Sequence, residues 1–319
     1  MPGIDQGRFA GTLLGAAAGE SLGAPHEFKT ADEVGEQREI VSGGGWAAGE
    51  PTDDIALTLV LLRSLVAHGR LDLEDVARGQ LRWLATGPKD IGNLTRAALS
   101  KLRAGRPPTE SGALAWEESN RHSAGNGSVM CCAPIGLLHA KDLGGLAEDA
   151  AAFSRITHFD PRCVAGCIAV TTAIACLVGG GRESRSDAEG AVEASSGAAA
   201  VEAASRALAA AAAVSDEACA AIGRGVSRRP SELRVDGQDQ GFVLHTLAIA
   251  FSALCSASSF EEGVVSVVAR GGDTDTNGCV AGALLGARFG RRQIPERWLT
   301  KLKAGPELSS LADALYGRL

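Results

Sequence analysis

Two short acidic clusters, far apart in the chain, combine carboxylates with hydroxyls. The first is Pro51-Thr52-Asp53-Asp54 and the second runs from Gly271 to Asn277, and each is followed by an apolar run with helical periodicity. Neighbouring carboxylates repel one another unless a cation neutralises them. Asp and Thr oxygens are hard ligands, which suit Mg²⁺, Mn²⁺ or Ca²⁺ better than zinc. The predicted metal ligands are therefore Thr52, Asp53, Asp54, Asp273, Asp275 and Thr276.

Helix capping is the plainer interpretation of the same clusters. A Thr or Asp at a helix N-terminus satisfies free backbone donors, and acidic first turns suit the helix dipole. Capping explains one carboxylate for each helix, but not two carboxylates with a Thr hydroxyl beside each pair. The Gly271-Gly272 pair also allows a sharp turn, so that Asp273 and Asp275 can both point inward. We therefore favour metal binding, with capping as an additional role.

Three further segments could take part in chemistry. Glu27 follows a Gly-rich apolar run, and Gly125-Asn126-Gly127-Ser128-Val129-Met130 opens a predicted helix. Free amides at a helix N-terminus bind anions well, so this second segment is a candidate phosphate site. His158 follows Thr157 just before another helix. Each has a simpler alternative: a solvated carboxylate, an ordinary turn with a Ser cap, and a structural histidine.

Four runs of this sequence together resemble the ADP-ribosylglycohydrolase family. They are GGDTDT, PTDD, GTLLGAAAGESLGAPHEF and GNGSVMCCAPIGLL, and they extend from Gly11 to about Gly290. The most similar types are the dinitrogenase reductase-activating glycohydrolases and the ADP-ribosylarginine hydrolases. The resemblance implies an all-helical hydrolase with a centre of two Mg²⁺ or Mn²⁺ ions, which takes the six residues already predicted as ligands. Two such ions can clamp a substrate and activate water.

The resemblance also assigns roles to individual residues. Asp54 and Asp273 join Glu27 as catalytic residues, with Glu27 as a mobile general base or proton relay that closes over the metals. Glu20 stands where many relatives carry Asp, and we expect a structural role for it. Cys131 stands where relatives often carry Arg, which removes part of the local polar contact. The implied substrate-binding residues are Glu27, Gly125, Asn126, Gly127, Ser128, Met130 and His158, and those of the 125–130 loop together with His158 would contact the diphosphate and distal ribose.

The leaving group and the adenine pocket are less well defined by the sequence. ADP-ribosylated arginine is the first candidate substrate, and the others are ADP-ribosylated serine, O-acetyl-ADP-ribose and ADP-ribosylated nucleic acid. A silent relative that only binds ADP-ribose would be expected to lose metal ligands, and a two-metal phosphohydrolase would be expected to use His ligands. Phe242 and Tyr316 could each stack on a base or lie in the core.

The net charge and the cysteine pattern limit the binding partners and the redox environment that we expect for the protein. The 319 residues carry a formal net charge of −7, which argues against a large nucleic-acid footprint without excluding a small one. The eight cysteines form no CxxC pair or regular framework, which predicts reduced, buried thiols. We expect a cytoplasmic monomer that acts on an ADP-ribosylated protein or small molecule, releases ADP-ribose, and has no membrane segment.

Helical periodicity must position these residues, because Ala and Leu are strong helix formers and alternating strand patterns are scarce. The predicted fold is all-α: a single compact orthogonal helical bundle over residues 1–319, with the two-metal site in a central cleft and a flexible Gly/Ser-rich loop near 179–197. The predicted helices are Arg8–Gly19, Asp54–His68, Leu73–Ala85, Leu94–Leu102, Val129–His139, Gly144–Arg155, Pro161–Leu177, Ala198–Val214, Gln240–Cys255, Phe260–Arg270, Asp275–Phe289, Pro295–Lys303 and Leu308–Leu319.

Two series of glycines at every fourth position need an explanation. One series begins at Gly11 and continues through Gly15, Gly19 and Gly23, and the other begins at Gly278 and continues through Gly282, Gly286 and Gly290. Each series lies on roughly one helix face. Glycine weakens a helix, so its repetition favours close approach of another backbone over coincidence. We expect these two helices to be central and tightly packed.

Overall fold

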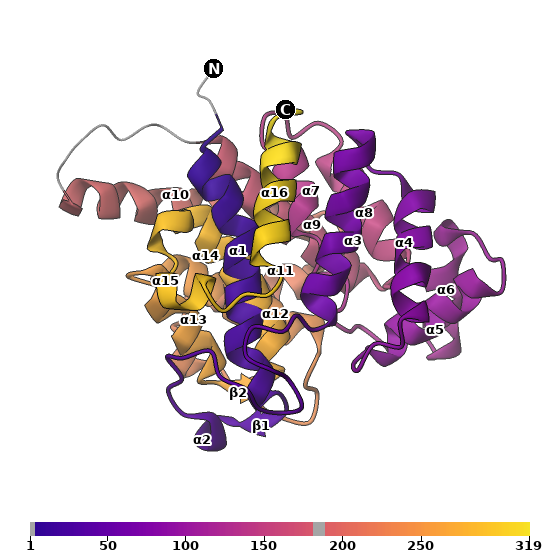
Figure 1. Cartoon of the computed structure of the whole chain (residues 1–319), viewed down its shortest axis with the longest axis horizontal. Helices are drawn as coiled ribbons and strands as arrows, with labels where there is room; N and C mark the ends of the chain where they lie inside the picture. Colours follow the sequence, from indigo (N-terminus) through magenta and orange to yellow (C-terminus); the bar gives the residue numbers. More distant parts are fainter. Residues whose placement is uncertain (1–3, 181–188) are drawn as a thin grey trace.

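The computed structural model describes residues 4–180 and 189–319, and this part of the chain is predominantly α-helical (Figure 1). The β-structure of this part is a two-residue antiparallel pair, β1 (Lys29–Thr30) with β2 (Gly271–Gly272). The α-helices are α1 (Gln6–Gly23), α2 (Ala31–Val34), α3 (Asp53–His68), α4 (Leu73–Ala85), α5 (Asn93–Arg103), α6 (Pro108–Glu118), α7 (Ala133–Leu138), α8 (Leu146–Arg155), α9 (Pro161–Gly179), α10 (Glu189–Ala212), α11 (Asp216–Val226), α12 (Val243–Ser256), α13 (Phe260–Val268), α14 (Thr274–Phe289), α15 (Glu296–Leu299) and α16 (Gly305–Tyr316). Three 3₁₀ turns accompany them: η1 (Ala24–His26), η2 (Pro230–Glu232) and η3 (Arg291–Gln293). The predicted all-α class is confirmed.

Helices from opposite ends of the chain, α1 and α14, lie backbone to backbone along the two glycine series. A methyl group placed on Gly11 would lie 2.6 Å from the carbonyl oxygen of Gly286, and one on Gly15 would lie closer still to that of Gly282. Gly19 and Gly278 face each other in the same way. The packing interpretation of the glycines is therefore confirmed. Because α3 also packs against both helices, the starts of α3 and α14 are brought to one region.

Replacing Gly15 by Ala will destabilise the protein by about 1–3 kcal/mol, because the added methyl group must push α1 away from the Gly282 carbonyl. Gly197 in α10 is the matched control, since a methyl group there meets nothing within 4 Å. Gly197→Ala will raise stability by about 0.5–1 kcal/mol through helix propensity. Chemical denaturation of both variants measures the contrast. Equal stability of the two would mean that the α1–α14 contact tolerates a side chain.

The hydrophobic core is centred on α9 and α12, whose residues are almost all buried. α9 is long and apolar enough to cross a membrane by length and composition, but 83% of its most apolar window is buried against other helices. All eight cysteines are free, and five of them are buried: Cys131, Cys132, Cys163, Cys167 and Cys279. This agrees with the expected reduced thiols.

Several sequence-based boundaries were wrong. The expected loop near 179–197 is partly helical, because α10 begins at Glu189. The Ala-rich stretch after this segment has high helix propensity, which favours extension of the helix toward its N-terminus. Residues 181–188 of the expected loop lie outside the described part. The helix expected from Val129 begins at Ala133, with Pro134 in its first turn. The helix expected over 295–303 is the single turn α15. α6 and α11 were not anticipated, although Pro108 and Ser215 mark their starts.

Candidate metal centre and substrate cleft

The first acidic cluster begins α3, and a buried glutamate holds it in place. Thr52 is the N-cap residue, and the Glu20 carboxylate accepts hydrogen bonds from the backbone N–H groups of Thr52 at 2.8 Å and Ile55 at 3.0 Å. The Thr52 hydroxyl lies 2.8 Å from that same carboxylate and 3.0 Å from Asp54 Oδ2. Glu20 therefore satisfies free donors at the helix start, which supports the structural role expected for it.

The second cluster begins α14 after a sharp turn. Gly271 and Gly272 have φ values of 67° and 75°, a left-handed conformation that glycine adopts without strain. Asp273 occupies the N-cap position but makes no capping hydrogen bond, so capping does not account for its carboxylate. Instead, Asn126 Nδ2 donates to Asp273 Oδ2 at 2.8 Å and to Thr246 Oγ1 at 3.0 Å. Asn126 thus fixes the orientation of Asp273 from the 125–130 loop.

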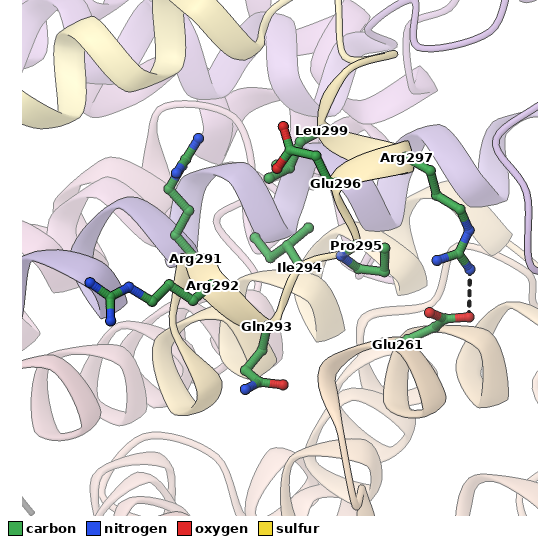
Figure 2. A pocket seen from close by; sticks show the side chains of 9 residues that line it. All are labelled: Glu261, Arg291, Arg292, Gln293, Ile294, Pro295, Glu296, Arg297 and Leu299. Atoms are coloured by element: carbon green, nitrogen blue, oxygen red, sulfur yellow. Dashed lines mark hydrogen bonds and ion pairs between the residues drawn. The ribbon is translucent and has the colours of Figure 1, made fainter.

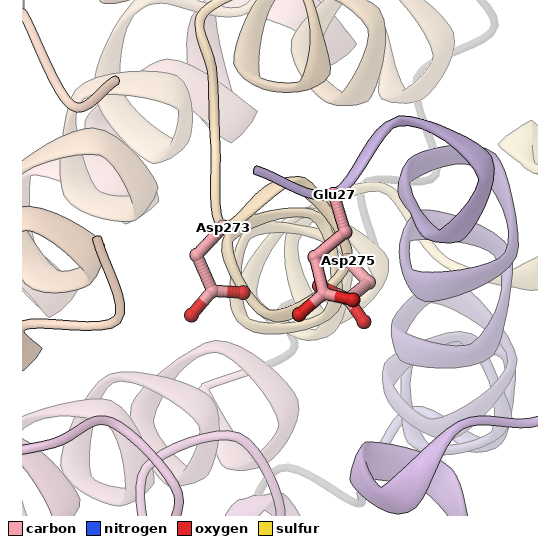
Figure 3. A group of neighbouring side chains, drawn as sticks. All are labelled: Glu27, Asp273 and Asp275. Atoms are coloured by element: carbon pink, nitrogen blue, oxygen red, sulfur yellow. The ribbon is translucent and has the colours of Figure 1, made fainter. Parts of the chain in front are cut away.

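The two clusters meet at one place in the fold. Thr276 Oγ1 of α14 lies 3.4 Å from Asp54 Oδ2 of α3. Glu27, which follows η1, points into the same space, and one carboxylate oxygen each of Glu27, Asp273 and Asp275 lies within 4.8 Å of the others (Figure 3). The sequence predicted Glu27 as a base; the geometry makes it a candidate ligand as well. The packing of α1, α3 and α14 against one another therefore brings these oxygen donors close together.

Burial and mutual repulsion perturb these carboxyl groups. Burial, followed by the charge of Asp273, raises the pKa of Glu27 to about 8. Burial, followed by the charge of Asp90, raises the pKa of Asp53 to about 7. The pKa values of Asp54 and Asp275 are raised well above the ordinary range, again first by burial and then by neighbouring carboxylates. The centre is therefore electrostatically unfavourable when these groups are ionised together without a counter-charge.

A cation fits this set of residues. Asp54 Oδ1 and Asp275 Oδ1 are buried and have no hydrogen-bond partner among the described residues. Buried polar atoms without partners are rare and need an explanation, such as an ion. The donors are carboxylate and hydroxyl oxygens, which hard divalent ions prefer. The described residues therefore support the predicted metal centre, in which Thr52 hydrogen-bonds with Asp54 and Asp53 begins the same helix.

A cleft of about 670 Å³ opens above the carboxylates. The 125–130 loop forms one wall together with His158, and their packing is tight, since a Cβ on Gly127 would lie 2.9 Å from His158 Cε1. Burial lowers the pKa of His158 to about 4, so the imidazole is neutral, and Nδ1 bonds with Thr157 Oγ1 at 2.8 Å. Gly125, Asn126, Gly127 and Met130 line the cleft as expected of a substrate loop.

Ser128 does not line this cleft. Its hydroxyl lies 3.0 Å from Ser154 Oγ, inside the core, so any contact to substrate would have to come from its backbone. Tyr316 packs against Phe9 and is not part of the cleft lining, whereas Phe242 lines the cleft with the Arg162 guanidinium 5.4 Å from its ring centre. The sequence analysis assigned no role to Asp90, which lies outside the motifs, or to Phe28, which ends the GTLLGAAAGESLGAPHEF run, yet both line the cleft.

A second hollow, of about 480 Å³, lies around η3 at the opposite end of α14 from the metal centre (Figure 2). Its lining includes Arg291, Arg292 and Arg297, and Arg297 pairs with Glu261 at 2.6 Å. α14 has 16 residues, which places the two hollows about 24 Å apart along the helix. The second hollow is therefore separate from the acidic cleft and has a basic character.

The whole sequence, residues 1–319, matches the family model described as ADP-ribosylglycohydrolase. This chain belongs to the ADP-ribosylglycohydrolase family. It is a glycosidase-type hydrolase that acts on ADP-ribose linkages. The resemblance inferred from the GGDTDT and PTDD runs is thereby confirmed.

Relatives of known name agree with this family over nearly the full length. The ADP-ribosyl-[dinitrogen reductase] glycohydrolase of Rhodospirillum rubrum is 30% identical, over 97% of this chain and 95% of that protein. An ADP-ribosylarginine hydrolase of Serratia proteamaculans is 26% identical, over 96% of this chain and 78% of that protein. A solved structure, an ADP-ribosylglycohydrolase-related protein complex, superposes with a TM-score of 0.76 at 28% identity and covers 98% of each chain.

Proposed function

We propose that this family member cleaves the bond between the distal ribose of ADP-ribose and an arginine side chain of a modified protein, with two Mg²⁺ or Mn²⁺ ions. The observation that carries the proposal is the convergence of carboxylates from α3, α14 and the Glu27 segment on the floor of one cleft. Two of these carboxylates, Asp54 and Asp275, have a buried oxygen with no hydrogen-bond partner among the described residues. Such a site needs cations, and its all-oxygen donors select hard ones.

The six predicted ligands would hold the ions: Thr52, Asp53, Asp54, Asp273, Asp275 and Thr276. When bound, the ions would stabilise the charge that develops in the transition state and would orient the hydroxyls of the distal ribose. Glu20 and Asn126 keep Thr52 and Asp273 in position through the hydrogen bonds described above. This arrangement would hold the ions, and through them the hydroxyls of the sugar, in a fixed orientation.

Glu27 and the loop wall would act on the substrate. The Glu27 carboxylate would take a proton from the attacking water, because it lies in the cleft beside Asp273 and Asp275, and bound cations would offset the carboxylate repulsion that raises its pKa and so favour the ionised, proton-accepting form. The 125–130 loop and neutral His158 would bind the diphosphate and distal ribose through backbone and imidazole hydrogen bonds. A neutral His158 adds hydrogen bonding there without contributing a charge.

Arginine is the leaving group that the cleft and the relatives favour. Asp90 adds a carboxylate beside Asp53 and Glu27 at the cleft wall, and carboxylates suit a cationic guanidinium. The names of the Rhodospirillum and Serratia relatives refer to ADP-ribosylated dinitrogen reductase and to ADP-ribosylarginine, respectively. The proposal extends this substrate class to the present chain.

A panel of defined substrates tests the proposal. We expect release of ADP-ribose from ADP-ribosyl-arginine with Mg²⁺ or Mn²⁺, loss of turnover in excess chelator, and poor recovery with Zn²⁺. The comparison substrates are ADP-ribosyl-serine, O-acetyl-ADP-ribose and ADP-ribosylated nucleic acid. A higher kcat/KM on any of these would replace arginine as the leaving group. Full turnover in excess chelator would show that the reaction needs no metal ion.

A further inference from the structure

Phe28 adopts a conformation and an exposure that folding alone does not favour. Its φ of 63° is left-handed, which is uncommon for a bulky residue, and 61% of the residue is exposed to solvent. Glycine or asparagine would occupy such a position with less strain. Strained backbone of this kind is found where the surrounding structure enforces it, and it clusters at functional sites.

The surrounding structure holds the Phe28 backbone firmly. Its N–H donates to the Gly272 carbonyl oxygen at 2.7 Å, and the next residue, Lys29, pairs with Gly272 in the β1–β2 ladder. Glu27 lies directly before it at the end of η1. The segment is thus tied to the start of α14, which carries the predicted metal ligands Asp273, Asp275 and Thr276. Phe28 sits beside Glu27 at the wall of the cleft as a consequence.

The cleft that Phe28 lines carries several carboxylates, and the Phe28 ring has no aromatic or cationic partner among the described residues. Asp90 and Asp53 act on Glu27 as nearby negative charges, and all four side chains line the cleft. Among the described residues, Phe28 takes part in none of the ring–ring or cation–ring contacts, whereas Phe242 contacts both Arg162 and His245. An open aromatic face beside carboxylates is the environment that binds a planar guanidinium.

We propose that Phe28 is a specificity-determining residue, whose ring stacks on the guanidinium of the leaving group as it departs from the ribose beside Glu27. The inference rests on the proposed function, because it concerns the leaving group of that same reaction. The alternative use of the ring, against the ADP-ribose part of the substrate, is separated from it by the experiment below.

Phe28→Leu keeps an apolar side chain of similar size and removes the aromatic face, while Phe28→Tyr keeps the face. We expect Phe28→Leu to lower kcat/KM on ADP-ribosyl-arginine by about ten-fold, a loss in the range of a cation–π contact. Phe28→Tyr should stay within about two-fold of the wild type, and the Kd of ADP-ribose should be unchanged in both. Phe28→Gly should lose the same activity but be at least as heat-stable, since it relieves the strained φ.

The results divide clearly. An unchanged kcat/KM in Phe28→Leu overturns the inference, and so does a weaker Kd for ADP-ribose by the same factor, which would assign the ring to the ADP-ribose part. A Phe28→Gly variant that loses thermal stability along with activity would mean a structural role instead. Wild-type protein that binds ADP-ribose but does not cleave ADP-ribosyl-arginine would overturn the proposed leaving group itself, and this inference with it.

Discussion

Asp54→Asn and Asp273→Asn will each reduce turnover at least about 100-fold, although the two residues are more than 200 positions apart in the sequence. Asp54 lies in the first turn of α3, and Asp273 is the N-cap residue of α14. In α14, Thr276 Oγ1 lies 3.4 Å from Asp54 Oδ2. Each substitution removes a negative oxygen from the same centre. The double variant will be little worse than either single one, because residues that act as a unit are not additive. Steady-state kinetics of the three variants measures this.

The fold will survive these substitutions, which separates a metal site from a capping site. Burial and then the charge of Asp53 raise the pKa of Asp54 well above its ordinary range, so the folded protein disfavours its ionised form. Without cations, the free energy of unfolding should fall as pH rises from about 4 towards 8, and Asp54→Asn should fall less. Asp216→Asn, an exposed first-turn acid of α11, is the control and should retain full activity. Full activity of Asp54→Asn would leave capping as the sufficient explanation.

Glu27→Gln will lower kcat by about 10²–10⁴-fold, the usual contribution of a general base. Glutamine has the size and shape of glutamate but cannot accept a proton from water at neutral pH. The Kd of ADP-ribose should change far less, because the residues of α3, α14 and the loop wall still hold the product. Single-turnover kinetics together with ADP-ribose titration separates the two quantities.

Glu36→Gln provides the matched control for this prediction. Glu36 is an exposed glutamate in the chain segment after α2, and its partner Arg38 lies outside the cleft. It should behave as wild type in both measurements. If Glu27→Gln turned over at the wild-type rate, Glu27 would have no part in proton transfer. The number of ions that the variant binds would then test whether the Glu27 carboxylate is a metal ligand.

The sequence was most informative where one local pattern has one physical cause. The two glycine series predicted that another backbone approaches each helix closely, because repeated glycine in a helix is otherwise costly, and the structure shows that α1 and α14 approach each other. The paired carboxylates predicted convergence because burial of several like charges needs a counter-ion. In both cases each half of the pattern is local to one helix or its first turn, and packing of the helices brings the two halves together.

The sequence was least informative where a residue depends on distant neighbours. Asn126 was expected to contact substrate, and the structure also ties it to Asp273 and Thr246 of two other elements. Asp90 and Phe28 reach the cleft from irregular segments, whose course no periodicity describes. Ser128 lies in a motif yet faces the core, because the 125–132 segment is a series of turns before α7 rather than the first turns of a helix. Tertiary packing decides such positions.

Calorimetric titration with Mn²⁺ tests most directly the central claim that both acidic clusters form one metal centre. We expect two ions bound per chain in the wild type and in the Asp216→Asn control. Asp54→Asn and Asp273→Asn, each altered in a different cluster, should both bind fewer than two ions or bind them at least about ten-fold more weakly. A wild-type protein that binds no divalent ion, or two variants that bind two ions as the wild type does, would contradict this claim.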